Sequence, residues 1–122
     1  ADLSDDMREI AAGLGVYKRL FGLDMTADYN IAAKDAYDAV ICVGVFGFGP
    51  PHVEHIHHIM GAAKPGAPIL MTVNASGWLV RGWDQTFAPH LAEHGITLVR
   101  DAPIRHMIKD GIGAHLIELR RG

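Results

Sequence analysis

The stretch YDAVICVGVFGFG, residues 37–49, decides how the fold is read from this sequence. Residues 39–45 are apolar apart from one glycine, so neither side of the run offers a polar surface to water. Such continuous apolar runs are typical of a central strand of a parallel sheet, which is buried on both faces. Glycines follow at 47 and 49, and glycine lets a backbone approach a ligand closely. The sequence therefore predicts a buried strand at residues 39–43 that opens into a glycine-rich loop.

The segments around this strand alternate between helical and extended patterns. Ser4 is an expected N-cap for a first helix, with acidic residues in the first turn. We expect helices at about residues 5–13, 52–63 and 84–94, strands at 17–21, 39–43, 68–73, 96–100 and 114–119, and irregular chain at 101–113. Buried strands that alternate with helices indicate an α/β fold with a mainly parallel sheet and helices on both faces. Because no helix separates the last two strands, we expect the final strand to be antiparallel.

Length and composition exclude several classes of protein. The chain has 122 residues, 49% hydrophobic and 20% charged, which fits one packed globular domain. A net charge of −3 gives no electrostatic reason to expect a nucleic-acid partner or an anionic membrane. No apolar run is long enough to span a bilayer, and no signal peptide is visible. The single cysteine, Cys42, lies inside the apolar strand, so we expect a small buried core residue and a cytoplasmic protein.

Four stretches together resemble a known family. ADLSDDMREIAAGLGVY, LFGLDM, YDAVICVGVFGFG and MGAAKPGAPILMTVN are spaced as in class I S-adenosylmethionine-dependent methyltransferases. They look most like the small methyltransferases related to the Williams-Beuren-region methyltransferase-like protein. The resemblance covers nearly the whole chain and is weakest in its C-terminal third. It implies a Rossmann-like fold, S-adenosyl-L-methionine as cofactor, and methyl transfer to a small-molecule acceptor.

The resemblance also implies which residues hold the cofactor. The family binds the cofactor ribose with an acidic residue at the end of its second strand, and Asp2 matches that position. Leu3 and Met7 would then pack near the adenine and the ribose. Asp24 matches an acidic residue that contacts the adenine amine, and Met25 would follow it as an apolar wall. An aspartate before a helix or in a turn also has ordinary roles, as a cap or a turn former.

The loop after the central strand supplies the rest of the expected site. By resemblance, the backbone of Val43, Gly44 and Val45 lies near the methionine part of the cofactor. The candidates for contact with the acceptor are Phe46, Phe48, His52 and Trp78. The phenylalanines either line that pocket or plug the core, and Trp78 either caps the pocket or anchors its loop. No catalytic residue is assigned, since methyl transfer needs a general base only when the acceptor must lose a proton.

One departure from the family is large. Its first strand and glycine-rich loop, which precede the position of Asp2, have no counterpart here. We therefore expect residues 1–122 to be the C-terminal portion of a single methyltransferase domain, N-terminally incomplete and possessing little activity alone. Because an incomplete sheet exposes strand edges, a homo-oligomer is a further expectation. The alternative is a truncated, non-catalytic Rossmann-like binding or interaction module.

The sequence is rich in histidine, which raises the question of a metal. HVEHIHHIM holds four histidines, but none of them is four residues from another, and we expect a solvated helix face and no metal ligand. A metal-dependent hydrolase is a distant third reading. The other histidines are expected on the surface or on strand faces: His90, His94, His106 and His115.

Overall fold

In the computed structural model, the described residues are 1, 3–26, 35–47 and 49–122, with the side chains of 106–108 left aside. The elements are α1 (Asp5–Gly13), β1 (Val40–Phe46), η1 (Val53–His55), α2 (Ile56–Ala62), β2 (Pro68–Asn74), α3 (Ala75–Val80), α4 (Trp83–Glu93), β3 (Ile96–Met107), η2 (Ile108–Asp110) and β4 (Ile112–Arg121). None of the helices in this part of the chain has the length and apolar character needed to cross a bilayer.

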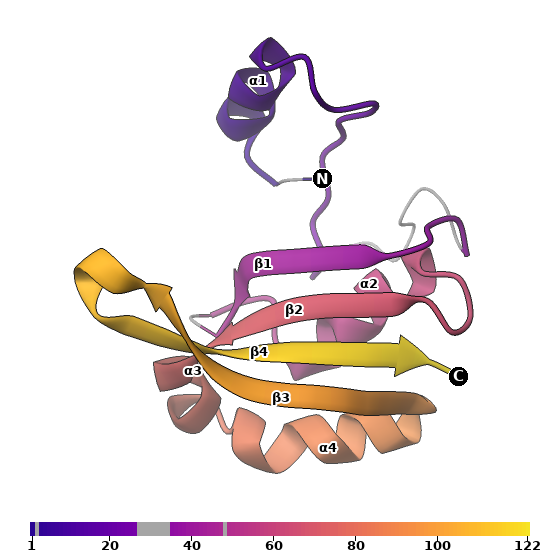
Figure 1. Cartoon of the computed structure of the whole chain (residues 1–122), viewed down its shortest axis with the longest axis vertical. Coiled ribbons are helices and arrows are strands. Elements are labelled where there is room, and N and C mark those ends of the chain that lie inside the picture. The colour runs from indigo at the N-terminus through magenta and orange to yellow at the C-terminus, as the bar shows by residue number, and fades with distance from the viewer. Residues whose placement is uncertain (2, 27–34, 48) are drawn as a thin grey trace.

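The strands form one sheet in the order β1-β2-β4-β3 (Figure 1). β1 and β2 are parallel, and β4 is antiparallel to both of its neighbours, β2 and β3. It follows that β1, β2 and β3 run in one direction and β4 in the other. The α/β class, the mainly parallel strand direction and the antiparallel last strand are therefore confirmed.

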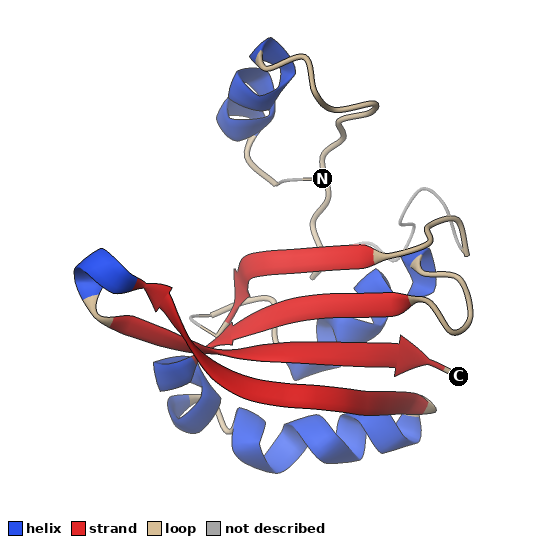
Figure 2. Cartoon of the chain, viewed as in Figure 1, coloured by secondary structure: helices blue, strands red, loops and turns tan. Residues whose placement is uncertain are grey.

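The core lies between this sheet and the helices α2, α3 and α4 (Figure 2). Ile69, Met71 and Val73 of β2 are completely buried, and so are Ile117 and Leu119 of β4. They share one apolar cluster with these residues from the helical layer: Val53, Ile56, Ile59, Met60, Trp83, Phe87 and Leu91. The alternation of side chains along a strand sends every second residue to the opposite face.

That opposite face corrects the expectation of a sheet covered by helices on both sides. Ile41 and Val43 of β1 are 70% and 54% exposed, and Leu70 of β2 is 37% exposed, whereas Cys42 between them is buried. β1 has the apolar composition of a strand that is buried on both faces of a sheet. Among the described residues, only the face that carries Cys42 is covered. Among the described residues, its ladder runs to β2 alone, so β1 is an edge strand.

Three local predictions were wrong. Residues 17–21 form no strand and lie mostly exposed after α1. Residues 101–113, expected to be irregular, are mostly strand, because β3 and β4 continue as a long hairpin that turns at η2 and Gly111. The short helix α3 was not predicted. Along residues 101–105, exposed and half-buried residues alternate, and the register between β3 and β4 continues to the turn, so pairing across the turn defines the hairpin.

Backbones meet very closely where β1 and β2 end. A Cβ atom on Gly77 of α3 would lie 1.6 Å from the carbonyl oxygen of Gly47. A Cβ atom on Gly47 would lie 2.7 Å from the backbone nitrogen of Asn74, and Gly47 has a φ of +116°. Only glycine fits at either position, so these two residues fix the chain after β1 against the start of α3.

We predict that Gly77→Ala destabilises the protein by about 3 kcal/mol, since the neighbouring atom is backbone and cannot rotate away. The control is Gly61→Ala in α2, where a Cβ atom would meet nothing within 4 Å. Alanine favours helix there by about 0.5–1 kcal/mol. Urea unfolding of both variants measures the free energy of unfolding. Equal stability of the two variants would contradict the close contact.

Candidate functional site

The C-terminal ends of β1 and β2 form the edge where open α/β sheets bind ligands. β1 bulges there, because Cys42 pairs with Met71 and Phe46 with Val73, which leaves three residues of β1 opposite one of β2. Gly44, with φ +74°, occupies the centre of the bulge. Its N–H donates a hydrogen bond to Thr72 Oγ1 at 3.1 Å. The bulge therefore exposes the valines on either side of Gly44 but already uses the N–H of Gly44 within the protein.

Phe46 belongs to the core. It is 2% exposed and packs edge-on against Trp83, with ring centroids 5.5 Å apart. This placement matches a core plug and leaves almost none of the ring to line a pocket. Phe48 lies outside the described residues.

The Trp78 side chain of α3 contacts both the sheet and α4. It stacks on His115 of β4 with centroids 4.2 Å apart and an angle of 19° between the rings. It also meets the edge of Phe87 at 5.3 Å. Half-buried and held on two sides, Trp78 has the contacts of a loop anchor, and part of its surface is exposed.

His52 lines a cavity between η1 and α4. The cavity has a volume of about 490 Å³, and its lining includes Glu54, Arg81, His90 and Glu93 as well as His52. The His52 backbone N–H donates to His55 Nδ1 at 2.8 Å, which holds the turn that enters the cavity. A cavity of this size with charges of both signs is suited to a small polar molecule.

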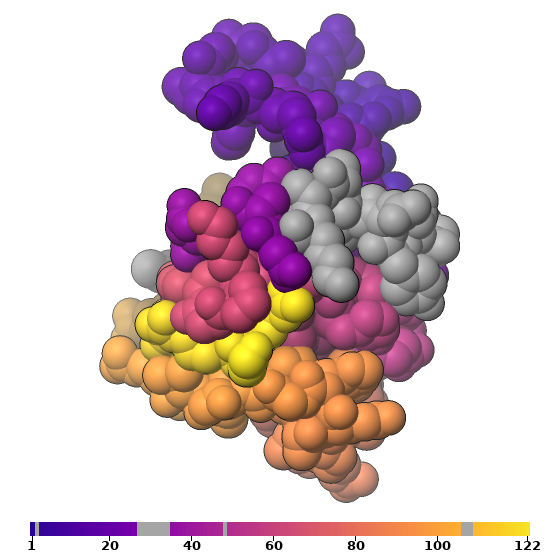
Figure 3. All heavy atoms as spheres, turned by 90° about the vertical axis from the view of Figure 1, so that its right-hand side faces the viewer, coloured from indigo at the N-terminus to yellow at the C-terminus, as the bar shows by residue number. Residues whose placement is uncertain are grey.

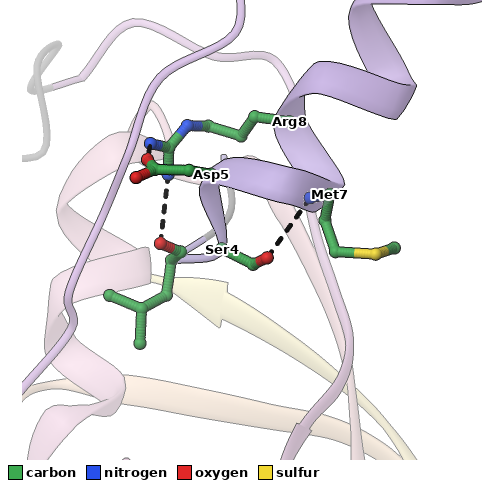
Figure 4. Close-up of polar contacts among 5 residues, drawn as sticks. Ser4, Asp5, Met7 and Arg8 are labelled. Carbon is green, nitrogen blue, oxygen red and sulfur yellow. Dashed lines mark hydrogen bonds and ion pairs between the residues drawn. The ribbon is translucent and has the colours of Figure 1, made fainter.

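The expected adenosine-binding residues of α1 lie on a helix that stands apart from the sheet (Figures 1 and 3). Ser4 is the N-cap, as predicted, and its side chain accepts a hydrogen bond from the Met7 N–H at 3.2 Å (Figure 4). No residue of α1 is buried; Met7 is 54% exposed and the preceding Leu3 is 68% exposed. Asp2 lies outside the described residues.

Arg8 is the link between α1 and the chain on either side of it. It forms an ion pair with Asp5, and its Nη1 donates to the Leu3 carbonyl oxygen at 3.1 Å (Figure 4). The guanidinium also lies against Gly22, where a Cβ atom would be 2.9 Å from Nη1. This arrangement leaves the Leu3 and Met7 side chains accessible to a ligand.

Asp24 and Met25 have internal roles in the structure. Asp24 Oδ1 accepts hydrogen bonds from the Thr26 N–H at 2.9 Å and from Thr26 Oγ1 at 2.6 Å, which is the pattern of a turn former. Met25 is buried and belongs to the apolar core. The described residues thus fit an adenosine in part: Leu3, Met7 and the Asp24 carboxylate have suitable chemistry, whereas Met25 offers little surface.

Sequence reasoning missed Asn74 at the end of β2. Its Oδ1 caps α3 by accepting from the N–H groups of Ser76 at 3.0 Å and Gly77 at 3.3 Å. Asn74 is 4% exposed, and its Nδ2 is buried without a hydrogen-bond partner among the described residues. The sequence feature that indicates this cap is the asparagine directly after an apolar run, because asparagine is a common residue at the start of a helix.

A second missed feature is a group of histidines on the helical layer. His57 of α2 stacks on His94 at the C-cap of α4, with centroids 5.2 Å apart and an angle of 12°. His90 of α4 lies 4.4 Å from the His94 ring. The sequence feature that indicates this group is the four-residue spacing of His90 and His94 on a predicted helix. That pair lies outside the histidine-rich stretch HVEHIHHIM, which alone was considered for metal binding.

Burial changes the acid–base properties of several groups. It lowers the pKa values of His57 and His90, and the neighbouring charge of His94 lowers both further. Both rings therefore favour the neutral form. Cys42 is buried, so the expectation of a small buried core residue is confirmed, and burial raises the pKa of its thiol to about 11.

Comparison with solved structures establishes the fold. The chain resembles the [4+2]-cyclase SpnF with a TM-score of 0.67 and 14% identity, over 98% of this chain and 64% of that one. It resembles the N-methyltransferase NodS from Bradyrhizobium japonicum WM9, in complex with S-adenosyl-l-homocysteine, with a TM-score of 0.56 and 16% identity over 83% and 53%. The 16S rRNA (adenine(1408)-N(1))-methyltransferase from Catenulisporales acidiphilia, as its W203A mutant, gives 0.56 and 15% over 80% and 55%.

The chain thus spans less than two thirds of the length of each of these proteins. No family model matches the sequence, and no curated protein matches it either. At these identities the likeness shows the Rossmann-like fold alone. By their names the three neighbours are a [4+2]-cyclase, an N-methyltransferase and a 16S rRNA methyltransferase, so they do not identify an acceptor.

Proposed function

We propose that this chain carries out methyl transfer from S-adenosyl-L-methionine to a small-molecule acceptor, as the C-terminal portion of a single methyltransferase domain. The observation that carries the proposal is the sheet, with order β1-β2-β4-β3 and its one reversed strand. Two of the solved structures that share this fold are methyltransferases by name. Because a fold hosts many functions, the proposal depends on the residues at the strand ends.

The cofactor would lie along the C-terminal edge of β1. The proposed contacts are Asp2, Leu3, Met7, Asp24, Met25, Val43, Gly44 and Val45. Bound there, S-adenosyl-L-methionine supplies a methyl group that its sulfonium already activates. The protein then has to orient the acceptor and exclude water, which are the main contributions of positioning to such a reaction. The exposed valines of the bulge and the apolar side chains of α1 serve that exclusion.

The acceptor would approach from the side of His52 and Trp78. His52 opens onto the cavity between η1 and α4, where Arg81 and Glu54 can bind polar groups of either charge. The size of this cavity and the net charge of −3 favour a small molecule over a nucleic acid. Of the two phenylalanines, Phe46 supports the pocket from the core, and Phe48 is proposed from the sequence.

One observation favours the alternative, a non-catalytic binding or interaction module. The N–H of Gly44 and Oδ1 of Asp24 are both engaged in hydrogen bonds within the protein, and Met25 is buried. The two functions differ in whether the C-terminal edge of β1 binds the cofactor at all.

We propose that the isolated chain associates with further copies of itself. β1 is an edge strand whose uncovered face carries Ile41 and Val43, and such edges pair readily with other chains.

We predict that the 122-residue chain sediments as a dimer or larger species and that Ile41→Lys shifts it towards monomer at the same concentration. Analytical ultracentrifugation measures both. A single sharp monomer for the unmodified chain would argue against association through β1.

The function itself is tested by calorimetric titration with S-adenosylhomocysteine. We expect micromolar binding that Asp24→Asn weakens by about 10–100-fold, the effect of losing a hydrogen bond to a charged group. Asparagine keeps the Oδ1 acceptor for Thr26, so the turn is preserved. The control is Asp38→Asn, because Asp38 precedes β1 and pairs with Lys64 at 2.6 Å, far from the expected site.

The two functions predict different outcomes of this titration. Binding that is weakened by Asp24→Asn and unaffected by Asp38→Asn supports the methyltransferase. No binding by the unmodified chain would contradict an assembled cofactor site and favour the non-catalytic module.

A further inference from the structure

Three histidines from two helices converge on one point of the helical layer. His57 lies in the first turn of α2, His90 in the last turn of α4, and His94 at the C-cap of α4. Each ring offers one nitrogen, and these three nitrogens lie within 4.8 Å of one another. None of the three is a cofactor contact proposed above, and His90 also lines the cavity proposed for the acceptor.

We propose that His57, His90 and His94 bind a divalent transition metal ion, with Zn²⁺ as the best-fitting ion. Neutral imidazole nitrogens are preferred ligands of Zn²⁺, and three histidines with one open position are a common zinc coordination set. Two nitrogens on a tetrahedral zinc lie about 3.4 Å apart, given Zn–N distances of about 2.0–2.1 Å. Side-chain rotations that move each nitrogen by about 1 Å would therefore bring the three nitrogens to the spacing of a tetrahedral site.

The arrangement of the rings supports a shared ligand. His90 and His94 are four residues apart and so occupy the same face of α4. His57 approaches that face from α2, parallel to the His94 ring and 6.1 Å from the His90 ring. One nitrogen of each ring thus belongs to a single cluster between the two helices, where an ion would connect α2 to α4.

Burial gives the site two anchored ligands and one accessible ligand. His57 and His90 are half-buried, whereas His94 is exposed, which provides a path for an ion to enter. His90 Nε2 is buried and has no hydrogen-bond partner among the described residues. A buried polar atom without a partner is costly, and a bond to a metal would remove that cost.

The electrostatic surroundings suit a cation. The carboxylates of Glu54 and Glu93 lie close enough to act on His90 and would attract the ion.

The position of the site relates it to the cavity. His90 is part of the cavity lining, together with Glu54 and Glu93. An ion held by the three histidines would therefore lie at one border of the cavity. The competing explanation is that the three rings pack only against each other, and this explanation predicts no saturable metal binding.

The test uses the tag-free 122-residue chain after removal of metal with a chelator. Co²⁺ is titrated while visible absorption reports its coordination, and Zn²⁺ is then added in competition. The variants are His90→Gln and His94→Gln, and the control is His115→Gln, a histidine on β4 that pairs with Asp101 outside the cluster. Circular dichroism of each metal-free variant checks that the fold is retained, which we expect above all for the exposed His94.

We expect one Co²⁺ per chain with the intense absorption of tetrahedral cobalt, displaced by an equal amount of Zn²⁺. Loss of a ligand should weaken binding at least about 10-fold in His90→Gln and His94→Gln, and His115→Gln should bind like the unmodified chain. Unchanged affinity in a folded His94→Gln variant would overturn the proposal, as would the absence of saturable binding by the unmodified chain. These readouts do not involve S-adenosylhomocysteine, so they stand apart from the test of the methyltransferase function.

Discussion

The rest of the structure depends on the contact between Gly47 and Gly77. At this point the chain that leaves β1 touches the first turn of α3 so closely that neither residue can carry a side chain. Asn74 completes the junction by capping α3. Since α3 leads directly into α4, the contact places the tryptophans of these helices, the cavity beside η1, and the histidines at the end of α4. The glycines after β1 therefore serve first to join two parts of the fold.

Among the described residues, helices cover one face of the sheet only, and this asymmetry separates the cofactor edge from the cavity and the three histidines. The C-terminal edge of β1 lies beside an exposed apolar face, where a cofactor or another chain could cover Ile41 and Val43. The cavity and the three histidines belong to the helical layer on the other side, between α2, η1 and α4. The cavity proposed for the acceptor and the three histidines share His90, so a bound ion would border that cavity, whereas none of the proposed cofactor contacts belongs to either.

Much of the fold was predictable because local patterns record burial. The apolar run at β1, the alternation in β4 and the Ser4 cap each predicted the correct element. The hairpin over residues 101–113 was missed because polar and apolar residues are mixed there and its order comes from pairing across the turn. The site was less predictable for the same reason: the burial of Phe46 and the meeting of His57 with His94 depend on how distant helices pack. Only the four-residue spacing of His90 and His94 was visible in the sequence.

We propose that the cofactor binds at the C-terminal edge of β1. The amide spectrum of ¹⁵N-labelled chain with and without S-adenosylhomocysteine tests this proposal residue by residue. We expect the largest shifts at Val43, Gly44, Val45 and Gly47, and on the chain around Asp24, with little change at His90 and His94. Shifts confined to the cavity beside η1, or no shifts at saturating ligand, would contradict it.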